Sequence, residues 1–366
     1  MYSNFNFLQN DWQGLAKIGE MAEYTLYKDP NTAIMKLRQF GEELINTMIK
    51  IENLFYSYNS FEKDSGFLGS LKDFFKRREI KKLAIEDFNL EVEMGEIIGI
   101  LGPNGSGKTT LIKLLTGILN PESGIIECDG NIPFKKEKSY LKSIGVVIGQ
   151  KSQLIWDLPA EETLEMLRCI YKIDKTSYRN KLNNMVELLN LEDKLRVPVR
   201  KLSLGERIKF EIICALIHSP KILFLDEPTI GLDITSQRSI HEFLLDINKK
   251  DNVTIFLTSH YMKDIETLCD RVIILLNGKK VEDSNINEII NKFSAKDEYI
   301  IEFKDFIPDE FNCFKLLDKK KLQVNFDEAN FILKNVDFLL IKNISCENKS
   351  FEDVVFDIFS EGKKED

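Results

Sequence analysis

The stretch GPNGSGKTT, residues 102–110, decides the fold of this chain. It follows the apolar run IIGIL (97–101) and precedes LIKLLTGIL (111–119). A short apolar run beside a glycine-rich turn is typical of a buried strand, and the segment after the turn predicts a helix. The stretch matches the pattern G-x-x-x-x-G-K-[ST] in its required strand-to-helix context, which indicates a phosphate-binding loop.

Each residue type in this loop suits the phosphates of a nucleotide. Gly102, Gly105 and Gly107 let the backbone curl so that its N–H groups point inward, and the helix N-terminus adds partial positive charge. Lys108 can reach the β- and γ-phosphates of ATP, and the Thr109 hydroxyl can ligate Mg²⁺. The predicted ATP-binding residues of this loop are Gly102, Pro103, Asn104, Gly105, Ser106, Gly107, Lys108, Thr109 and Thr110.

A second chemical motif is ILFLDEP, residues 222–228. Asp226 ends an apolar strand and is placed to hold Mg²⁺, and Glu227 follows it as a candidate general base toward an attacking water. Two adjacent carboxylates at a strand end would be costly to bury without cations, whereas Mg²⁺-ATP gives both a role. The two motifs together predict a nucleotide hydrolase.

The composition limits the class of protein further. The chain has 366 residues, of which 43% are hydrophobic and 30% charged, as in an ordinary globular protein. Its net charge of −9 gives no overall basic surface for nucleic acid, although a local patch remains open. No apolar run approaches the roughly 18 residues that a membrane span needs, so a membrane role would require another chain to provide the spans.

The hydrophobic pattern divides the chain into three parts. Residues 1–47 predict two short helices, an appendage that cannot bury a core alone and must dock on the rest of the chain or on a partner. Residues 48–285 alternate strands and helices, which predicts an α/β fold with a parallel sheet, and residues 286–366 predict a small α+β region. Residues 59–82 interrupt the second part with a short apolar face and a basic flank. This insertion is either an interfacial helix near anionic lipid or a solvated segment packed on its own domain.

Three more motifs follow in a fixed order: LSLGE (202–206), LDEPTIGLD (225–233) and TSH (258–260). Together with the phosphate loop, this set resembles the ATP-binding subunits of ABC transporters, over about residues 48–285. Within that superfamily, GQKSQLIWDLP (149–159) and the segments around the other motifs look like the exporter branch that is often linked to drug or polysaccharide efflux. The resemblance implies a P-loop NTPase fold of the ABC type that uses ATP and Mg²⁺.

The resemblance also assigns roles to particular residues. Tyr58 matches the aromatic residue that stacks on adenine, with Tyr56 as a rival because of the insertion that follows. Gln150 matches the glutamine that senses Mg²⁺ and the attacking water, on a segment that meets the membrane subunit. His260 matches the histidine that contacts the γ-phosphate and positions Glu227. The metal-binding set implied in this way is Thr109, Gln150 and Asp226. The other two histidines, His218 and His241, are expected to be structural or exposed.

The motif LSLGE carries the prediction of a dimer. Ser203 and Gly205 match the pair that binds the γ-phosphate of ATP held by the other subunit, again at a helix N-terminus. The resemblance therefore implies that two copies dock head to tail, and Asp233 matches the loop that communicates between the paired sites. Leu204 and Glu206 depart from the commoner LSGGQ form. We expect Leu204 to point away from the nucleotide and Glu206 to suit the helix dipole.

These observations predict an ATPase on the cytoplasmic face of the cell membrane, which dimerises around two ATP and powers export by a separate membrane-spanning permease. The alternative is a soluble ABC-type ATPase that acts on nucleic acid or in a DNA-related process. That alternative is kept because residues 1–47 resemble the N-terminal helical segment of some type I restriction-enzyme motor subunits. A third possibility is that residues 1–47 are a fusion remnant.

Overall fold

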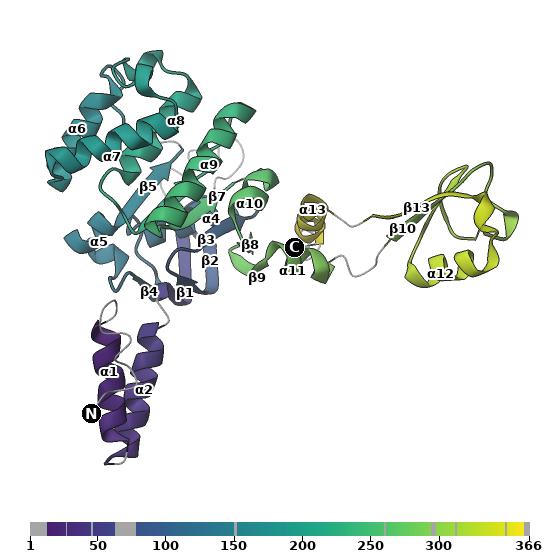
Figure 1. Ribbon diagram of the computed structural model, residues 1–366, viewed down its shortest axis with the longest axis horizontal. Helices are drawn as coiled ribbons and strands as arrows, with labels where there is room; N and C mark the ends of the chain where they lie inside the picture. The colour runs from purple at the N-terminus through teal and green to yellow at the C-terminus, as the bar shows by residue number, and fades with distance from the viewer. Residues whose placement is uncertain are drawn as a thin grey trace.

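The centre of the molecule is a six-stranded sheet, seen in the computed structural model (Figure 1). In spatial order its strands are β5 (Ile144–Ile148), β6 (Ile222–Asp226), β7 (Thr254–Thr258), β3 (Ile97–Leu101), β8 (Arg271–Leu276) and β9 (Lys279–Asn285). The first five run parallel and β9 is antiparallel to β8. The structure describes residues 13–26, 28–44, 47–62, 78–149, 152–259, 261–293, 298–311, 313–347 and 350–361.

The central strands are apolar because both faces of the sheet are covered. Every residue of β3, β6 and β7 is buried, and β3 and β6 confirm the predicted strands at 97–101 and 222–226. One face packs on helix α4 (Lys108–Leu115) and on a three-stranded sheet. The other face packs on a helical layer. The predicted parallel α/β sheet is therefore confirmed.

The helical layer fills most of residues 160–268. Its helices are α6 (Ala160–Tyr171), α7 (Lys175–Leu188), α8 (Leu204–Leu216), α9 (Ile234–Asp251) and α10 (Met262–Leu268). Helix α5 (Lys138–Ser143) precedes β5. Short 3-10 turns lie at Pro133–Lys135, Glu192–Lys194, Val199–Lys201, Asp309–Phe311 and Phe338–Leu340. Among the described residues, no helix has both the length and the apolar character needed to cross a membrane.

The three-stranded sheet is antiparallel, with the order β2 (Arg78–Glu93), β1 (Thr47–Glu62) and β4 (Ser123–Cys128). The β1–β2 pairing extends to the partners Glu62 and Arg78. Both ends of the predicted insertion at 59–82 are therefore strand, which corrects the expected bounds of the insertion. Strand pairing continues there because the two segments satisfy each other's backbone hydrogen bonds. Residues 63–77, with the predicted apolar face, lie outside the described residues.

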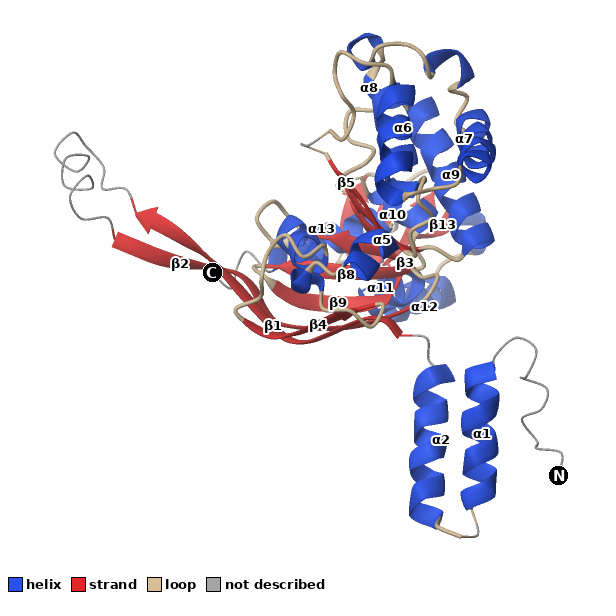
Figure 2. Cartoon of the chain, turned by 90° about the vertical axis from the view of Figure 1, so that its left-hand side faces the viewer, coloured by secondary structure: helices blue, strands red, loops and turns tan. Residues whose placement is uncertain are grey.

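The predicted N-terminal helices are confirmed as α1 (Gln13–Thr25) and α2 (Pro30–Leu44). Asp29 accepts hydrogen bonds from the backbone N–H of Asn31 and Thr32, so it caps α2 just before Pro30. Ala22 and Ala33 are buried between the two helices. Figure 2 shows this hairpin projecting from the start of β1.

The C-terminal part leaves the main core and returns to it. Helix α11 (Ile286–Phe293) and helix α13 (Phe351–Glu361) pack together against the main core, through residues such as Ile289 and Val354. Between them lies a separate sheet (Figure 1) with the order β11 (Lys315–Asp318), β12 (Lys321–Val324), β10 (Glu298–Phe303) and β13 (Ile341–Glu347), covered by α12 (Phe326–Asn335). The division at 48–285 and 286–366 remains a proposal, and these contacts favour placing α11 and α13 with the main unit.

Candidate nucleotide site

The carboxyl ends of four parallel strands meet at one edge of the central sheet. Thr258 of β7 pairs with Asp226 of β6 on one side and with Ile100 of β3 on the other. Ile148, at the end of β5, pairs with Asp226. The loop at 102–107 follows β3 and therefore lies at the same edge as Asp226. Ligands of open parallel sheets bind at this edge.

The backbone of the loop requires glycine at two positions. Gly105 and Gly107 have φ angles of 85° and 109°, in the left-handed region that favours glycine. A Cβ atom on Gly107 would lie only 2.5 Å from the carbonyl oxygen of Ala84. Ser106 is buried and its hydroxyl has no hydrogen-bond partner in the structure. A buried hydroxyl without a partner is costly, so the loop fits a polar ligand such as a phosphate group.

Lys108 lies inside this loop. Its ammonium donates hydrogen bonds to the carbonyl oxygens of Gly102 at 2.6 Å and Pro103 at 3.1 Å. Burial lowers the pKa of Lys108, against the opposing influence of Glu227 and Asp226. The cation is therefore held beside two carboxylates, where an anionic ligand would favour its charged form further.

Two oxygen-bearing side chains lie together at the mouth of the loop. Thr109 Oγ1 lies 3.2 Å from Asp226 Oδ2, so two of the three residues predicted to bind Mg²⁺ lie together. Mg²⁺ prefers carboxylate and hydroxyl oxygens together with phosphate and water, so this pair fits the ion. Sequence reasoning missed Thr258, whose hydroxyl donates to Asp226 Oδ1 at 2.7 Å. The sequence pattern that could have identified Thr258 is a polar residue at the end of an apolar strand.

Glu227 adopts an unusual backbone conformation. Its φ angle of 56° is left-handed, which is uncommon for a residue other than glycine. The backbone N–H of Glu227 donates to the carbonyl oxygen of Thr258 at 3.0 Å and lies 3.1 Å from its hydroxyl oxygen. These contacts hold the turn after β6 against the end of β7. Strain of this kind gathers at functional sites, where the surrounding structure sustains it.

The structure separates the two candidate aromatic residues. The Tyr58 hydroxyl lies 3.1 Å from Thr110 Oγ1, and Tyr58 as a whole is 37% exposed. Tyr56 packs instead against the core beneath the three-stranded sheet, and its ring meets that of Tyr58 edge-on with 5.0 Å between centroids. Tyr58 therefore offers an accessible ring beside the phosphate loop, which supports its predicted role over Tyr56.

Gln150 and His260 lie outside the described residues, so their roles remain predictions. Strands β5 and β7 end close to them in the sequence, at Ile148 and Thr258, on the edge that carries Asp226.

Ser203 and Glu206 form a reciprocal cap at the start of α8. The Ser203 hydroxyl accepts the N–H of Glu206 at 3.2 Å, and Glu206 Oε2 accepts the N–H of Ser203 at 2.8 Å. Glu206 also lies 3.1 Å from the ammonium of Lys194. Burial would raise the pKa of Glu206, but the bonds from Ser203 and Lys194 outweigh it, and the pKa lies below its ordinary value. Glu206 thus acts as a helix cap, in agreement with the expected fit to the dipole.

Gly205 lies against the start of α9 in the same chain. A Cβ atom there would lie 2.5 Å from the hydroxyl oxygen of Ser236. Asp233 caps α9 by accepting the N–H of Ser236 at 2.9 Å and its hydroxyl at 2.7 Å. Leu204 is exposed and lies beside Gly231. The structure thus brings the motifs at 202–206 and 225–233 together, and the contacts described for Ser203 and Gly205 do not include the phosphate loop.

A buried carboxylate on α8 contacts the segment that follows Gln150. Glu211 accepts hydrogen bonds from the Ser152 hydroxyl and from the backbone N–H groups of Gln153 at 3.0 Å and Leu154 at 3.3 Å. No sequence pattern signals this contact, because an acidic residue inside an apolar helix matches no motif. It links the chain after β5 to the helix that begins at Ser203.

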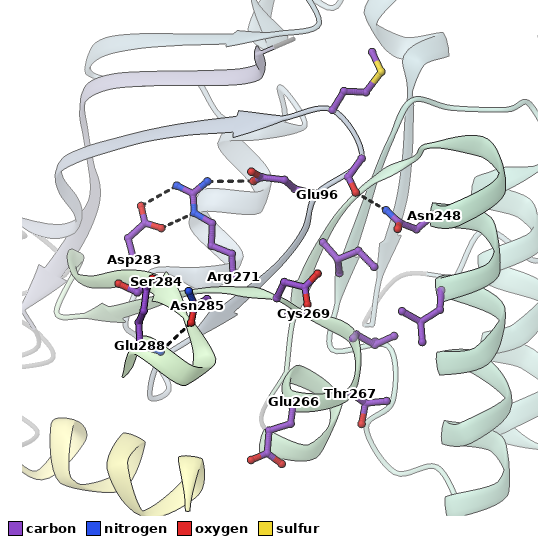
Figure 3. A pocket seen from close by; sticks show the side chains of 16 residues that line it. Glu96, Asn248, Glu266, Thr267, Cys269, Arg271, Asp283, Ser284, Asn285 and Glu288 are labelled. Carbon is purple, nitrogen blue, oxygen red and sulfur yellow. Dashed lines mark hydrogen bonds and ion pairs between the residues drawn. The ribbon is translucent and has the colours of Figure 1, made fainter. Parts of the chain in front are cut away.

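A cavity of about 750 Å³ lies at the opposite end of β3 and is not the nucleotide site (Figure 3). Arg271 spans part of it, with Nε 2.8 Å from Asp283 Oδ1 and Nη1 3.1 Å from Glu96 Oε2. This cluster joins β8 and β9 to the chain just before β3. Its lining residues include Glu96 and Ile97, at the amino end of the strand whose carboxyl end carries the phosphate loop.

A glycine-rich loop between a buried strand and a helix, with a lysine, an oxygen pair suited to Mg²⁺ and a neighbouring glutamate, defines a P-loop nucleotide hydrolase. Comparison with known proteins shows which family of P-loop nucleotide hydrolases the chain resembles. Residues 85–230 match the family model described as ABC transporter. The ABC transporter ATP-binding protein NatA of Bacillus subtilis is 32% identical over 222 residues, which is 61% of this chain and 89% of NatA.

Two further comparisons agree. The bacitracin transport ATP-binding protein BcrA of Bacillus licheniformis is 36% identical over 200 residues, 55% of this chain and 64% of BcrA. The dimeric structure of MJ0796, a bacterial ABC transporter cassette, superposes with a TM-score of 0.54 and 26% identity over 65% of this chain and 98% of that one. The chain belongs to the family of ABC transporter ATP-binding proteins, and it is an ATPase.

Proposed function

We propose that this chain is the ATP-hydrolysing subunit of an exporter. It lies peripherally on the cytoplasmic face of the cell membrane, uses ATP with Mg²⁺, and powers a separate membrane-spanning permease. The family supports the transport role, and both relatives compared above are transport proteins by name, which favours this role over the DNA-related alternative. The direction of transport rests on the resemblance of residues 149–159 and 258–275 to the exporter branch.

We propose a dimer because the phosphate loop and the LSLGE motif (202–206) make separate sets of contacts within one chain. Lys108, Thr109 and Asp226 lie together at one edge of the central sheet. Ser203, in contrast, caps α8, and Gly205 lies against α9. A helix N-terminus suits an anion, so the start of α8 can receive phosphate from a second copy. The MJ0796 cassette, solved as a dimer, supports this arrangement.

Each residue then has a defined task in hydrolysis. Tyr58 stacks on adenine, and Lys108 and the loop N–H groups bind phosphate oxygens. Thr109, Asp226 and Gln150 would hold Mg²⁺, which offsets the negative charge of the phosphates when it is bound. Glu227 accepts a proton from the attacking water, and the start of α8 from the second copy closes the site.

A groove beside β5 supports contact with a permease. Its volume is about 440 Å³, and Leu141, Ile148 and Tyr171 line it together with Gln153. Trp156, a few residues further on, is 53% exposed. Apolar side chains gathered around a groove suit an amphipathic helix of a partner, and this groove adjoins the segment expected to meet the membrane subunit.

The test is the size and turnover of the Glu227→Gln variant. With ATP and Mg²⁺ it should form a dimer by light scattering and lose nearly all turnover, because ATP is bound but no base accepts the proton. Lys108→Ala is the matched control and should stay monomeric, because it loses the phosphate contact. A Glu227→Gln protein that remains a monomer with wild-type turnover would overturn the proposal. Co-purification with a co-expressed permease and vesicle uptake or efflux assays then test the partner and the direction.

A further inference from the structure

A buried carboxylate outside the motifs lies between the two catalytic turns. Asp264 is on α10 and is 1% exposed. One of its oxygens, Oδ2, accepts the hydroxyl of Thr229 and, at 2.7 Å, the hydroxyl of Ser259. Thr229 lies two residues after Glu227, and Ser259 immediately precedes His260. A single oxygen atom therefore ties together the turns that carry the two predicted catalytic side chains.

The second oxygen of Asp264 is also occupied. Oδ1 lies 2.9 Å from Nε2 of His241 on α9, and His241 is buried. Burial would raise the pKa of Asp264, but bonds from His241, Thr229 and Ser259 outweigh it, and the pKa lies below its ordinary value. His241 was expected to be structural or exposed, and it is a buried member of this network.

The network is continuous with the backbone of both turns. The Ser259 hydroxyl accepts the N–H of Tyr261 at 3.0 Å, so the bond network spans the position of His260 in the sequence. The N–H of Leu232 donates to the carbonyl oxygen of Thr229 at 3.2 Å, which closes the turn after Glu227. Buried polar networks in which every member is bonded fix one arrangement of the groups they join.

We propose that Asp264 is a positioning residue for ATP hydrolysis, which holds Thr229, two residues after Glu227, in register with Ser259, the residue before His260. The inference rests on the proposed roles of Glu227 and His260. Asp264 does not touch the nucleotide itself. Its loss should therefore lower kcat without weakening nucleotide binding, because the contacts of the phosphate loop are left in place.

The central variant is Asp264→Asn, which keeps the size of the side chain and removes its charge. The amide keeps one acceptor oxygen for the two hydroxyls, but its nitrogen meets His241 as a donor, and the loss of charge weakens the bonds from Thr229 and Ser259, so both turns are held less firmly. We expect kcat to fall about ten- to a hundred-fold, with the affinity for a fluorescent ATP analogue unchanged within about two-fold. Asp264→Glu keeps the carboxylate and should recover part of the lost kcat.

A structural readout separates positioning from general stability. Amide hydrogen exchange at residues 229–232 and 261–263 should rise in Asp264→Asn while α4 stays protected. Asp283→Asn is the matched control, since it removes a partly buried, ion-paired carboxylate near the far end of β3. It should lower the midpoint of thermal unfolding and leave kcat unchanged.

If Asp264→Asn does not fold, two variants that each remove one hydrogen bond to Asp264 can still test the proposal. Thr229→Val and Ser259→Ala should each lower kcat with nucleotide affinity intact, and the double variant should show less than the sum of the two effects, because both bonds end on one oxygen. Unchanged kcat in Asp264→Asn, or in both single-bond variants, would overturn the inference. If Glu227→Gln also leaves turnover unchanged, the proposed function fails as well. If Glu227→Gln abolishes turnover, only the role of Asp264 fails.

Discussion

Thr258 donates its hydroxyl to Asp226 Oδ1 over 2.7 Å, and the same hydroxyl oxygen lies 3.1 Å from the backbone nitrogen of Glu227. One side chain at the end of β7 therefore holds both the Asp226 carboxylate and the backbone of Glu227 at the end of β6. Thr258 is fully buried, so water cannot replace it.

The Thr258→Val variant should keep the shape of the strand and lose this restraint. A hydrogen bond to a charged group is worth about 1.5–3 kcal/mol, so the Mg²⁺ concentration for half-maximal ATPase should rise about ten-fold or more. Thr254→Val removes a buried hydroxyl from the other end of β7, where it accepts the N–H of Gly95. That control should lose stability with no change in Mg²⁺ dependence, and an equal shift in both variants would contradict the role of Thr258.

Gly107→Ala should abolish nucleotide binding. The added Cβ would lie 2.5 Å from the Ala84 carbonyl oxygen, at a φ angle of 109° that alanine rarely adopts. Gly130→Ala is the control, because Gly130 also has a positive φ angle but open space around it. Gly130→Ala should cost only about 1–2 kcal/mol of stability and bind nucleotide normally by isothermal titration calorimetry. Normal binding by Gly107→Ala would show that the loop tolerates this displacement.

Tyr58→Ala should weaken ATP binding by about five- to a hundred-fold, since stacking on a base is worth about 1–3 kcal/mol. Tyr58→Phe removes only the hydroxyl that faces Thr110 and should keep most of the affinity. Tyr56→Ala should lower the free energy of unfolding, because Tyr56 packs on the core, with a smaller effect on ATP affinity. The reverse order of effects on affinity would assign the stacking role to Tyr56.

Gly205→Ala should block the ATP-dependent dimer in the Glu227→Gln background. Its Cβ would lie 2.5 Å from Ser236 Oγ and would displace the start of α8 from the Asp233 cap. Removing that hydroxyl in a Gly205→Ala, Ser236→Ala double variant should restore part of the dimer, as measured by light scattering. A dimer of wild-type affinity in the single variant would argue against a role for this glycine in the interface.

The ion pair in the cavity at the amino end of β3 predicts a pH dependence of stability. Burial would raise the pKa of Asp283, but bonds from Arg271 and Lys280 outweigh it, so the folded pKa lies below the ordinary value of about 3.9. The stabilisation is then complete above that value and is lost as pH falls through the folded pKa. The difference in unfolding free energy between wild type and Asp283→Asn should be constant from about pH 5 to 8 and should shrink below about pH 4. A difference that grows on acidification would contradict this sign.

The sequence predicted the elements whose residues act locally. The glycine loop, the buried strands, the two N-terminal helices and the cap at Asp29 all follow from patterns of a few neighbouring residues. The bounds of the insertion at 59–82 were wrong at both ends, because the pairing of residues 59–62 with 78–81 depends on contact across the segment between them and not on a pattern of neighbouring residues. The contact of Glu211 with residues 152–154 was missed for the same reason.

What the sequence determined by itself is the chemistry: a phosphate loop, a carboxylate for Mg²⁺, a candidate base and a helix start suited to an anion. These depend on residue type and short spacing. Only the tertiary structure decided which distant side chains meet, such as Tyr58 with Thr110 and Asp264 with Thr229 and Ser259. The physical reason is that such contacts arise from strand order and helix packing, which bring together residues whose separation along the chain carries no periodic signal.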